Sequence, residues 1–199
     1  MVAGARRIAV QVLYRVVHDG AWAAPTLDVE LQRGAVGRAD AALATQIVYG
    51  SLRVVPELDA AVERHASRPV KVDDWVRAVL RAGAFQLLHL ERVPPHAVVH
   101  DSVQLVRDKR GKRVAGFVNA ILRKVALDRP ERPEPPASLS VPPWVRNRLV
   151  ASIGVERTNA LLHLGTEPPS IDLRVRRDAD RESVAHAIRD ARPHARVSV

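Results

Sequence analysis

Apolar residues recur at helical spacing through most of the first 129 residues of the chain. In residues 6–17 the apolar positions Ile8, Val12 and Val16 follow one face, while Arg7 falls on the other. Comparable patterns span residues 25–33, 40–52, 58–65, 76–90, 97–107 and 114–127. Residues 76–90 are apolar around most of the circumference, which is typical of a helix surrounded by others. No strand period interrupts these patterns, so the sequence predicts an all-α bundle for residues 1–129.

Residues that begin or end helices separate these segments. Gly20 follows the first segment and is suited to end a helix. Pro56 forces a break between residues 40–52 and 58–65, because proline cannot donate a helical hydrogen bond. Asp73 or Asp74 is suited to begin the central helix, and Gly111 separates the last two segments. We therefore expect six or seven helices.

The composition changes after residue 129. Residues 130–143 contain six of the 14 prolines, which predicts a linker. Residues 144–199 are predicted to form two connecting helices and then the beginning of an α/β subdomain. Alternation over residues 171–176 predicts a half-buried strand, residues 180–191 an amphipathic helix, and residues 195–199 a second strand. The fold class expected is thus mainly all-α, a helical bundle followed by a linker and a truncated β-α-β segment.

The charge balance favours a polyanionic partner. The chain has 31 Lys+Arg against 22 Asp+Glu, a formal net charge of +9. Most of the cations are arginines, whose planar fork suits phosphate groups and base edges. A GC-rich gene explains the preference for arginine over lysine equally well, but it does not explain the net charge. The charge therefore favours nucleic acid as the partner.

Other classes of protein are disfavoured by composition. No apolar run approaches the roughly 20 residues of a membrane span, and the N-terminus lacks the apolar core of a secretory signal, so we expect a cytoplasmic protein without a membrane partner. The chain has no cysteine, which excludes a disulfide scaffold, a thiolate metal site and a cysteine nucleophile within it.

Two basic clusters are the candidate nucleic-acid contacts. Residues 107–113 hold five cations and one acid at an expected helix–helix connection, where cations and exposed helix amides together attract anions. The second cluster lies at the start of the first helix. The residues predicted to contact nucleic acid are Arg6, Arg7, Lys109, Arg110, Lys112 and Arg113. A solvated, non-binding loop remains the alternative interpretation of residues 107–113.

Signatures of catalysis and of cofactor binding are missing from the sequence. The ten glycines form no Gly-x-Gly pair, so no loop is predicted to hold a nucleotide or S-adenosylmethionine. His96 and His100 lack a third ligand at a metal-binding spacing, and we expect no metal site. Three dispersed tryptophans are expected to be packing residues rather than a base-stacking platform: Trp22, Trp75 and Trp144. No catalytic residue is assigned.

Several strings in the chain resemble a known family. They are Val-Tyr-Gly-Ser-Leu-Arg at 48–53, Leu-Arg-Ala-Gly-Ala-Phe-Gln-Leu-Leu at 80–88, Pro-Pro-His-Ala at 94–97 and Phe-Val-Asn-Ala-Ile-Leu-Arg at 117–123. In this order they resemble the NusB-type helical domain, and more narrowly the version in RsmB/Sun-type rRNA cytosine-C5 methyltransferases. The segment around Leu173-Arg-Val175 resembles the connection to the methyltransferase portion, although Arg176 stands where that family usually has asparagine.

The resemblance implies a non-catalytic RNA-binding portion of such a methyltransferase. It implies contacts from an arginine-rich first helix, which by position are Arg6 and Arg7. S-adenosylmethionine and the catalytic cysteine would belong to a further domain that this chain lacks. The expected partner is RNA, small-subunit rRNA in particular, with a separate methyltransferase portion or a ribosomal protein as further partners. The alternative is a stand-alone NusB-type transcription antitermination factor, against which the linker and the residues beyond it argue.

Overall fold

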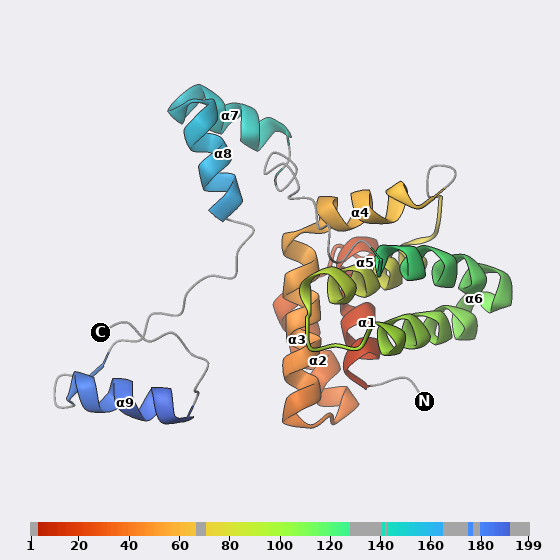
Figure 1. The fold of residues 1–199 in the computed structure, drawn as a ribbon, viewed down its shortest axis with the longest axis horizontal. Coiled ribbons are helices and arrows are strands. Elements are labelled where there is room, and N and C mark those ends of the chain that lie inside the picture. The colour runs from red at the N-terminus through yellow and green to blue at the C-terminus, as the bar shows by residue number, and fades with distance from the viewer. Residues whose placement is uncertain are drawn as a thin grey trace. The chain divides into compact units, whose positions relative to one another are not determined.

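The computed structural model describes residues 4–66, 71–127, 141, 143–164, 175–176 and 180–191, and all regular structure in these ranges is helical (Figure 1). The helices are α1 Gly4–His18, α2 Ala23–Gly34, α3 Arg38–Arg53, α4 Val55–Arg64, α5 Asp74–His89, α6 Pro95–Val125, α7 Pro143–Ile153, α8 Val155–Leu164 and α9 Arg181–Ala191. The chain divides into two compact units, Met1–Glu167 and Pro168–Val199. None of the described helices is long and apolar enough to cross a bilayer.

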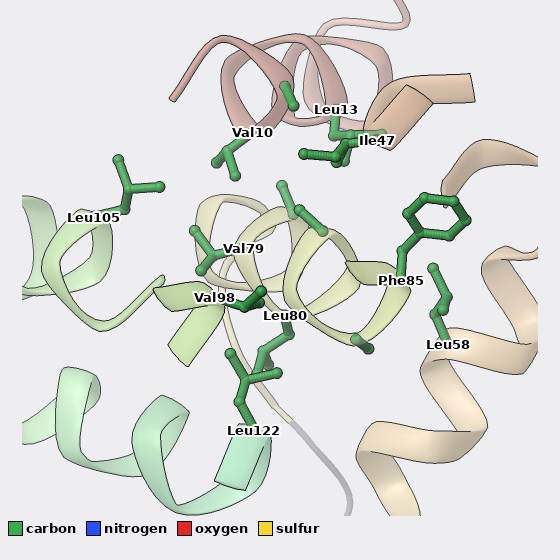
Figure 2. Packing of buried hydrophobic residues seen from close by; sticks show 14 of the residues in the cluster. Val10, Leu13, Ile47, Leu58, Val79, Leu80, Phe85, Val98, Leu105 and Leu122 are labelled. Carbon is green, nitrogen blue, oxygen red and sulfur yellow. The ribbon is translucent and has the colours of Figure 1, made fainter. Parts of the chain in front are cut away.

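Helix α5 is the centre of the bundle that α1–α6 form. It packs against α1, α3, α4 and α6, and eleven of its residues are buried. Figure 2 shows Val79 and Leu80 of α5 among apolar side chains from α1, α3, α4 and α6, including Val10 and Leu122. The prediction of an all-α bundle with residues 76–90 at its centre is confirmed.

Close approach of α3 to α5 depends on a glycine. A Cβ atom built on Gly50 would lie 2.0 Å from Cζ of Phe85, well inside any permitted contact. Glycine at position 50 therefore allows the Phe85 ring to lie directly against the α3 backbone.

The predicted helix ends are largely confirmed. Gly20 follows α1 with a φ of 65°. Only Val54 separates α3 from α4, and Pro56 occupies the first turn of α4, where its missing N–H costs nothing. Asp73 caps α5, with Oδ1 accepting hydrogen bonds from the N–H groups of Trp75 at 2.9 Å and Val76 at 3.1 Å.

The later helices form smaller groups. Helix α7 packs against α8, and the two meet at Gly154, whose φ is 83°. Thr158 and Leu162 of α8 are buried. These are the two connecting helices predicted beyond residue 143. The linker lies outside the described residues except for positions 141 and 143, and its role as a domain boundary stays a prediction.

The predicted β-α-β segment is not supported. Its helix is confirmed as α9, which begins after Asp180, whose Oδ2 accepts a hydrogen bond from the Ser183 N–H at 2.9 Å. Residues 171–174 and 195–199 lie outside the described residues. The two described residues at the end of the first expected strand, Val175 and Arg176, form no strand. Alternating apolar residues alone do not make a strand, because a strand needs a neighbour to pair with.

Candidate nucleic-acid interface

A sharp kink in α6 presents the larger basic cluster. Gly111 has φ 79° and ψ 176° inside this helix, a conformation that is essentially restricted to glycine. It divides α6 into two helical halves, as the sequence predicted. Lys109, Arg110, Lys112 and Arg113 flank the kink, and all four are exposed. Gly111 thus brings exposed cations from the end of one helical half and the start of the other together at the kink.

Lys109 is positioned by a buried aromatic ring. Its Nζ lies 3.5 Å from the ring centroid of Trp75, which is a cation–π contact. Trp75 is only 3% exposed, and its indole N–H points towards the carbonyl oxygen of Leu105 at 3.4 Å. Partial burial, followed by the positive charges of Arg110 and Arg7, lowers the pKa of Lys109. The start of α5 therefore holds the ammonium group in place.

Arg110 is tied to the same end of α5. Its Nε donates to Oδ2 of Asp73 at 2.7 Å, and its Nη2 donates to Oδ1 at 3.4 Å. Its Nη1 donates to the carbonyl oxygen of Lys109 at 3.1 Å. Burial alone would raise the pKa of Asp73, but the hydrogen bonds from Arg110, Val76 and Trp75 and the charge of Arg110 lower it overall. The hydrogen bond with Asp73 in turn raises the pKa of Arg110.

Helix α1 contributes one residue of the smaller basic cluster, Arg7, to this surface. Arg7 is exposed, and its charge acts on Lys109. About two turns further along α1, the Tyr14 ring contacts the edge of Trp75, with ring centroids 5.6 Å apart. His18 Nδ1 lies 2.8 Å from Oδ2 of Asp74. The start of α5 therefore contacts α1 through Tyr14 and His18, and it contacts the basic residues of α6 through Trp75 and Asp73.

Arg6 does not belong to this surface, and its prediction as a nucleic-acid contact is corrected. The residue is only 9% exposed and lies between α1, α5 and α6. Its Nε donates to Oε1 of Gln86 and its Nη1 to Oδ2 of Asp101, both at 2.8 Å. A guanidinium committed to two buried partners is a structural group. Successive helix positions lie about 100° apart, so Arg6 faces the bundle while Arg7 faces solvent.

A model of the NusB family matches residues 3–127, which include every residue of the site. The chain belongs to the NusB family. This confirms the family resemblance, and three relatives illustrate it. The probable ribosomal RNA small subunit methyltransferase B of Bacillus subtilis is 27% identical over 179 residues, covering 85% of this chain and 40% of the relative. Ribosomal RNA small subunit methyltransferase B of Thermus thermophilus is 37% identical over 140 residues, covering 70% of this chain and 33% of the relative. Transcription antitermination protein NusB of Halorhodospira halophila is 32% identical over 135 residues, covering 65% of this chain and 86% of the relative.

Solved structures of NusB proteins share the fold of this NusB-family chain. The solution structure of NusB from Aquifex aeolicus has a TM-score of 0.55 and 26% identity, covering 70% of this chain and 97% of that one. A crystal structure of antitermination factors NusB and NusE in complex with dsRNA has a TM-score of 0.58 and 26% identity, covering 63% of this chain and 95% of the matched chain. The chain spans 40% or less of the length of the two methyltransferases named above.

Sequence reasoning missed the residues that organise the NusB-family site. Asp73 was expected only to begin a helix, and Trp75 only to pack. Trp75 does pack, but Trp22 is 82% exposed and Trp144 is 71% exposed, so the expectation is wrong for these two. The site consists of two ammonium groups, three guanidinium groups and a carboxylate, with the Lys109 ammonium above the Trp75 indole. Such a set of groups binds anions through charge and hydrogen bonds.

Proposed function

We propose that this NusB-family domain binds RNA as a non-catalytic portion of an rRNA cytosine-C5 methyltransferase. The observation that carries the proposal is the convergence of Arg7 with the cations of the α6 kink beside Trp75. The proposed contacts are Arg7, Lys109, Arg110, Lys112 and Arg113. All five residues are exposed, so phosphate groups reach them without rearrangement of the core.

The residue types favour a phosphate backbone over a small anion. Guanidinium groups bind phosphate through paired hydrogen bonds, and lysine adds a point charge. Cations on two helices form an extended surface, which fits the repeating charge of a nucleic acid. Each phosphate that is neutralised releases bound counterions, so the affinity should fall steeply with salt.

The relatives support small-subunit rRNA as the class of RNA. Two of those described above are named ribosomal RNA small subunit methyltransferase B, and this chain covers at most 40% of their length. We infer that S-adenosylmethionine and the reacting cysteine belong to a separate methyltransferase portion, since this chain contains no cysteine. The protein would then act in the cytoplasm, together with the ribosomal RNA.

A second candidate function is transcription antitermination with a ribosomal protein as partner. The observation that favours it is the match to NusB of Halorhodospira halophila, of which this chain covers 86%. Pull-down of a small ribosomal protein by the full chain, in the absence of RNA, would support this alternative.

The test of RNA binding is fluorescence anisotropy of a labelled single-stranded RNA and a labelled double-stranded RNA over a series of salt concentrations. Replacing Lys112 and Arg113 by glutamine should weaken binding and reduce the salt slope by about 1 for each lost phosphate contact. Replacing Arg123 and Lys124 is the matched control, because both are exposed cations at the far end of α6. Equal losses from the two pairs, or a salt slope near zero for the wild type, would contradict the proposal.

A further inference from the structure

We propose that Asp73 is an internal competitor for Arg110, which an RNA phosphate must displace before it engages the guanidinium edge. The inference rests on the proposed RNA-binding function and deepens it. Asp73 occupies the Nε and Nη2 positions of Arg110, with contacts of 2.7 and 3.4 Å. This edge is the one that a phosphate would bind with two parallel hydrogen bonds. The free protein therefore presents Arg110 with its charge already neutralised.

The two oxygens of Asp73 have largely separate tasks. Oδ1 accepts the capping hydrogen bonds from Trp75 and Val76 and only a long contact of 3.4 Å from Arg110, whereas Oδ2 makes the short contact with Arg110. Release of Arg110 consequently leaves the cap of α5 in place. The bundle does not have to open for a phosphate to take the guanidinium.

The pair lies where RNA can reach it. The side chains of Arg110 and Asp73 are 39% and 44% exposed. An ion pair this exposed alters an equilibrium by about fivefold at most, so a phosphate that is also held by neighbouring cations can displace the carboxylate. A buried pair would not open in this way.

The neighbouring cations are differently placed. In the part of the chain that the structure describes, Lys112 and Arg113 have no ion pair or hydrogen bond, and neither does Arg7. These three residues make first contact with a phosphate backbone without losing a partner. Arg110 then contributes only when binding is strong enough to displace Asp73. The arrangement disfavours isolated anions, which meet too few cations, relative to a continuous backbone.

The experiment compares Asp73→Asn with Asp108→Asn in the full chain, by the anisotropy assay with the single-stranded and double-stranded RNA. Asparagine at 73 keeps an Oδ1 that caps α5 but replaces Oδ2 by an amide that cannot accept from Arg110. Asp108→Asn removes the same charge from a nearby exposed carboxylate that accepts from Gln104 instead. We expect D73N to bind RNA about two- to fivefold more tightly than the wild type and to steepen the salt slope by about 0.7 to 0.9. D108N should change both quantities less.

A double-mutant cycle isolates the competition from general charge. In an Arg110→Gln background, D73N should increase the affinity no more than D108N does. If D73N matches D108N with Arg110 present, or if its full effect persists without Arg110, the competition is refuted while RNA binding stands. If the wild type binds neither RNA, the proposed function itself fails and this inference with it. Should D73N lower the thermal midpoint, Asp73→Ser supplies a second capping residue without the carboxylate.

Discussion

Replacing Arg6 by methionine should destabilise the domain strongly, although Arg6 looks like a surface cation in the sequence. The Arg6 and Asp101 side chains are each 11% exposed, and their ion pair is 2.8 Å long. The variant leaves the Asp101 carboxylate buried without its guanidinium, a change that typically costs about 3–5 kcal/mol. Oε1 of Gln86 loses its donor as well. Solvent screens the Arg6 and Asp101 charges little, so we expect the loss of stability to fall within this range.

Urea unfolding followed by circular dichroism measures the loss. With a slope of about 2 kcal/mol per molar urea, the midpoint should fall by about 1.5–2.5 M. Arg7→Met is the matched control, because it removes the same kind of side chain from the neighbouring exposed position. Its free energy of unfolding should stay within about 0.5 kcal/mol of the wild type. Comparable midpoints for the Arg6 and Arg7 variants would refute the reasoning.

A double variant tests whether the loss arises from the orphaned carboxylate. Arg6→Met with Asp101→Leu removes both charges and fills the space with apolar groups, which is often neutral or stabilising for a buried pair. Oε1 of Gln86 still lacks a donor, which costs about 1–3 kcal/mol. The double variant should therefore be more stable than Arg6→Met alone. A double variant less stable than the single one would show that the pair contributes by packing rather than by charge.

Three further predictions concern glycines and pH. Gly50→Ala should lower the free energy of unfolding by about 1–3 kcal/mol, because the added Cβ would overlap the Phe85 ring. Gly116→Ala should raise the free energy of unfolding by about 0.5–1 kcal/mol, because an added Cβ meets nothing within 4 Å and alanine favours the helix. Thermal melts compare the two variants. Gly111→Ala should cost about 1–3 kcal/mol in urea unfolding and weaken RNA binding, because φ 79° with ψ 176° suits only glycine; unchanged stability would contradict this. Because the pKa of Asp73 in the folded protein is lowered from 3.8, its pair stabilises the fold above about pH 4 and is lost as the pH falls through the folded value. The difference in thermal midpoint between wild type and Asp73→Asn should accordingly disappear in acid and persist at neutral pH.

Sequence reasoning predicted the helices well because their signals are local. The spacing of apolar residues over one helix, and the glycine, proline or aspartate at its ends, lie within a few positions of each other. Gly111 is the clearest example, since a glycine between two apolar patterns indicated the kink that the structure shows. The strand expected at 171–176 rested on alternation alone, and its two described residues, Val175 and Arg176, form no strand.

The site was only partly predictable because its contacts join distant parts of the chain. Arg110 and Asp73 are 37 positions apart, and Arg6 and Asp101 are 95 apart. Periodicity identifies which face of a helix is apolar, but it does not reveal which carboxylate a cation at the edge of that face will meet. Asp73 was recognised through its local capping role, while the role of its second oxygen depends on α6.

Contacts with distant parts of the chain also decide how much positive charge the predicted cluster offers to a polyanion. Six cations were predicted as contacts, but Arg6 is buried in an ion pair and Arg110 is neutralised by Asp73. Four remain available, because Lys109 is an exposed residue although its Nζ lies above the Trp75 ring. At about 0.7–0.9 per phosphate neutralised, four cations correspond to a salt slope of about 3, against about 5 for all six. Partners contributed by distant helices therefore determine the electrostatics of this surface as much as the cations themselves do.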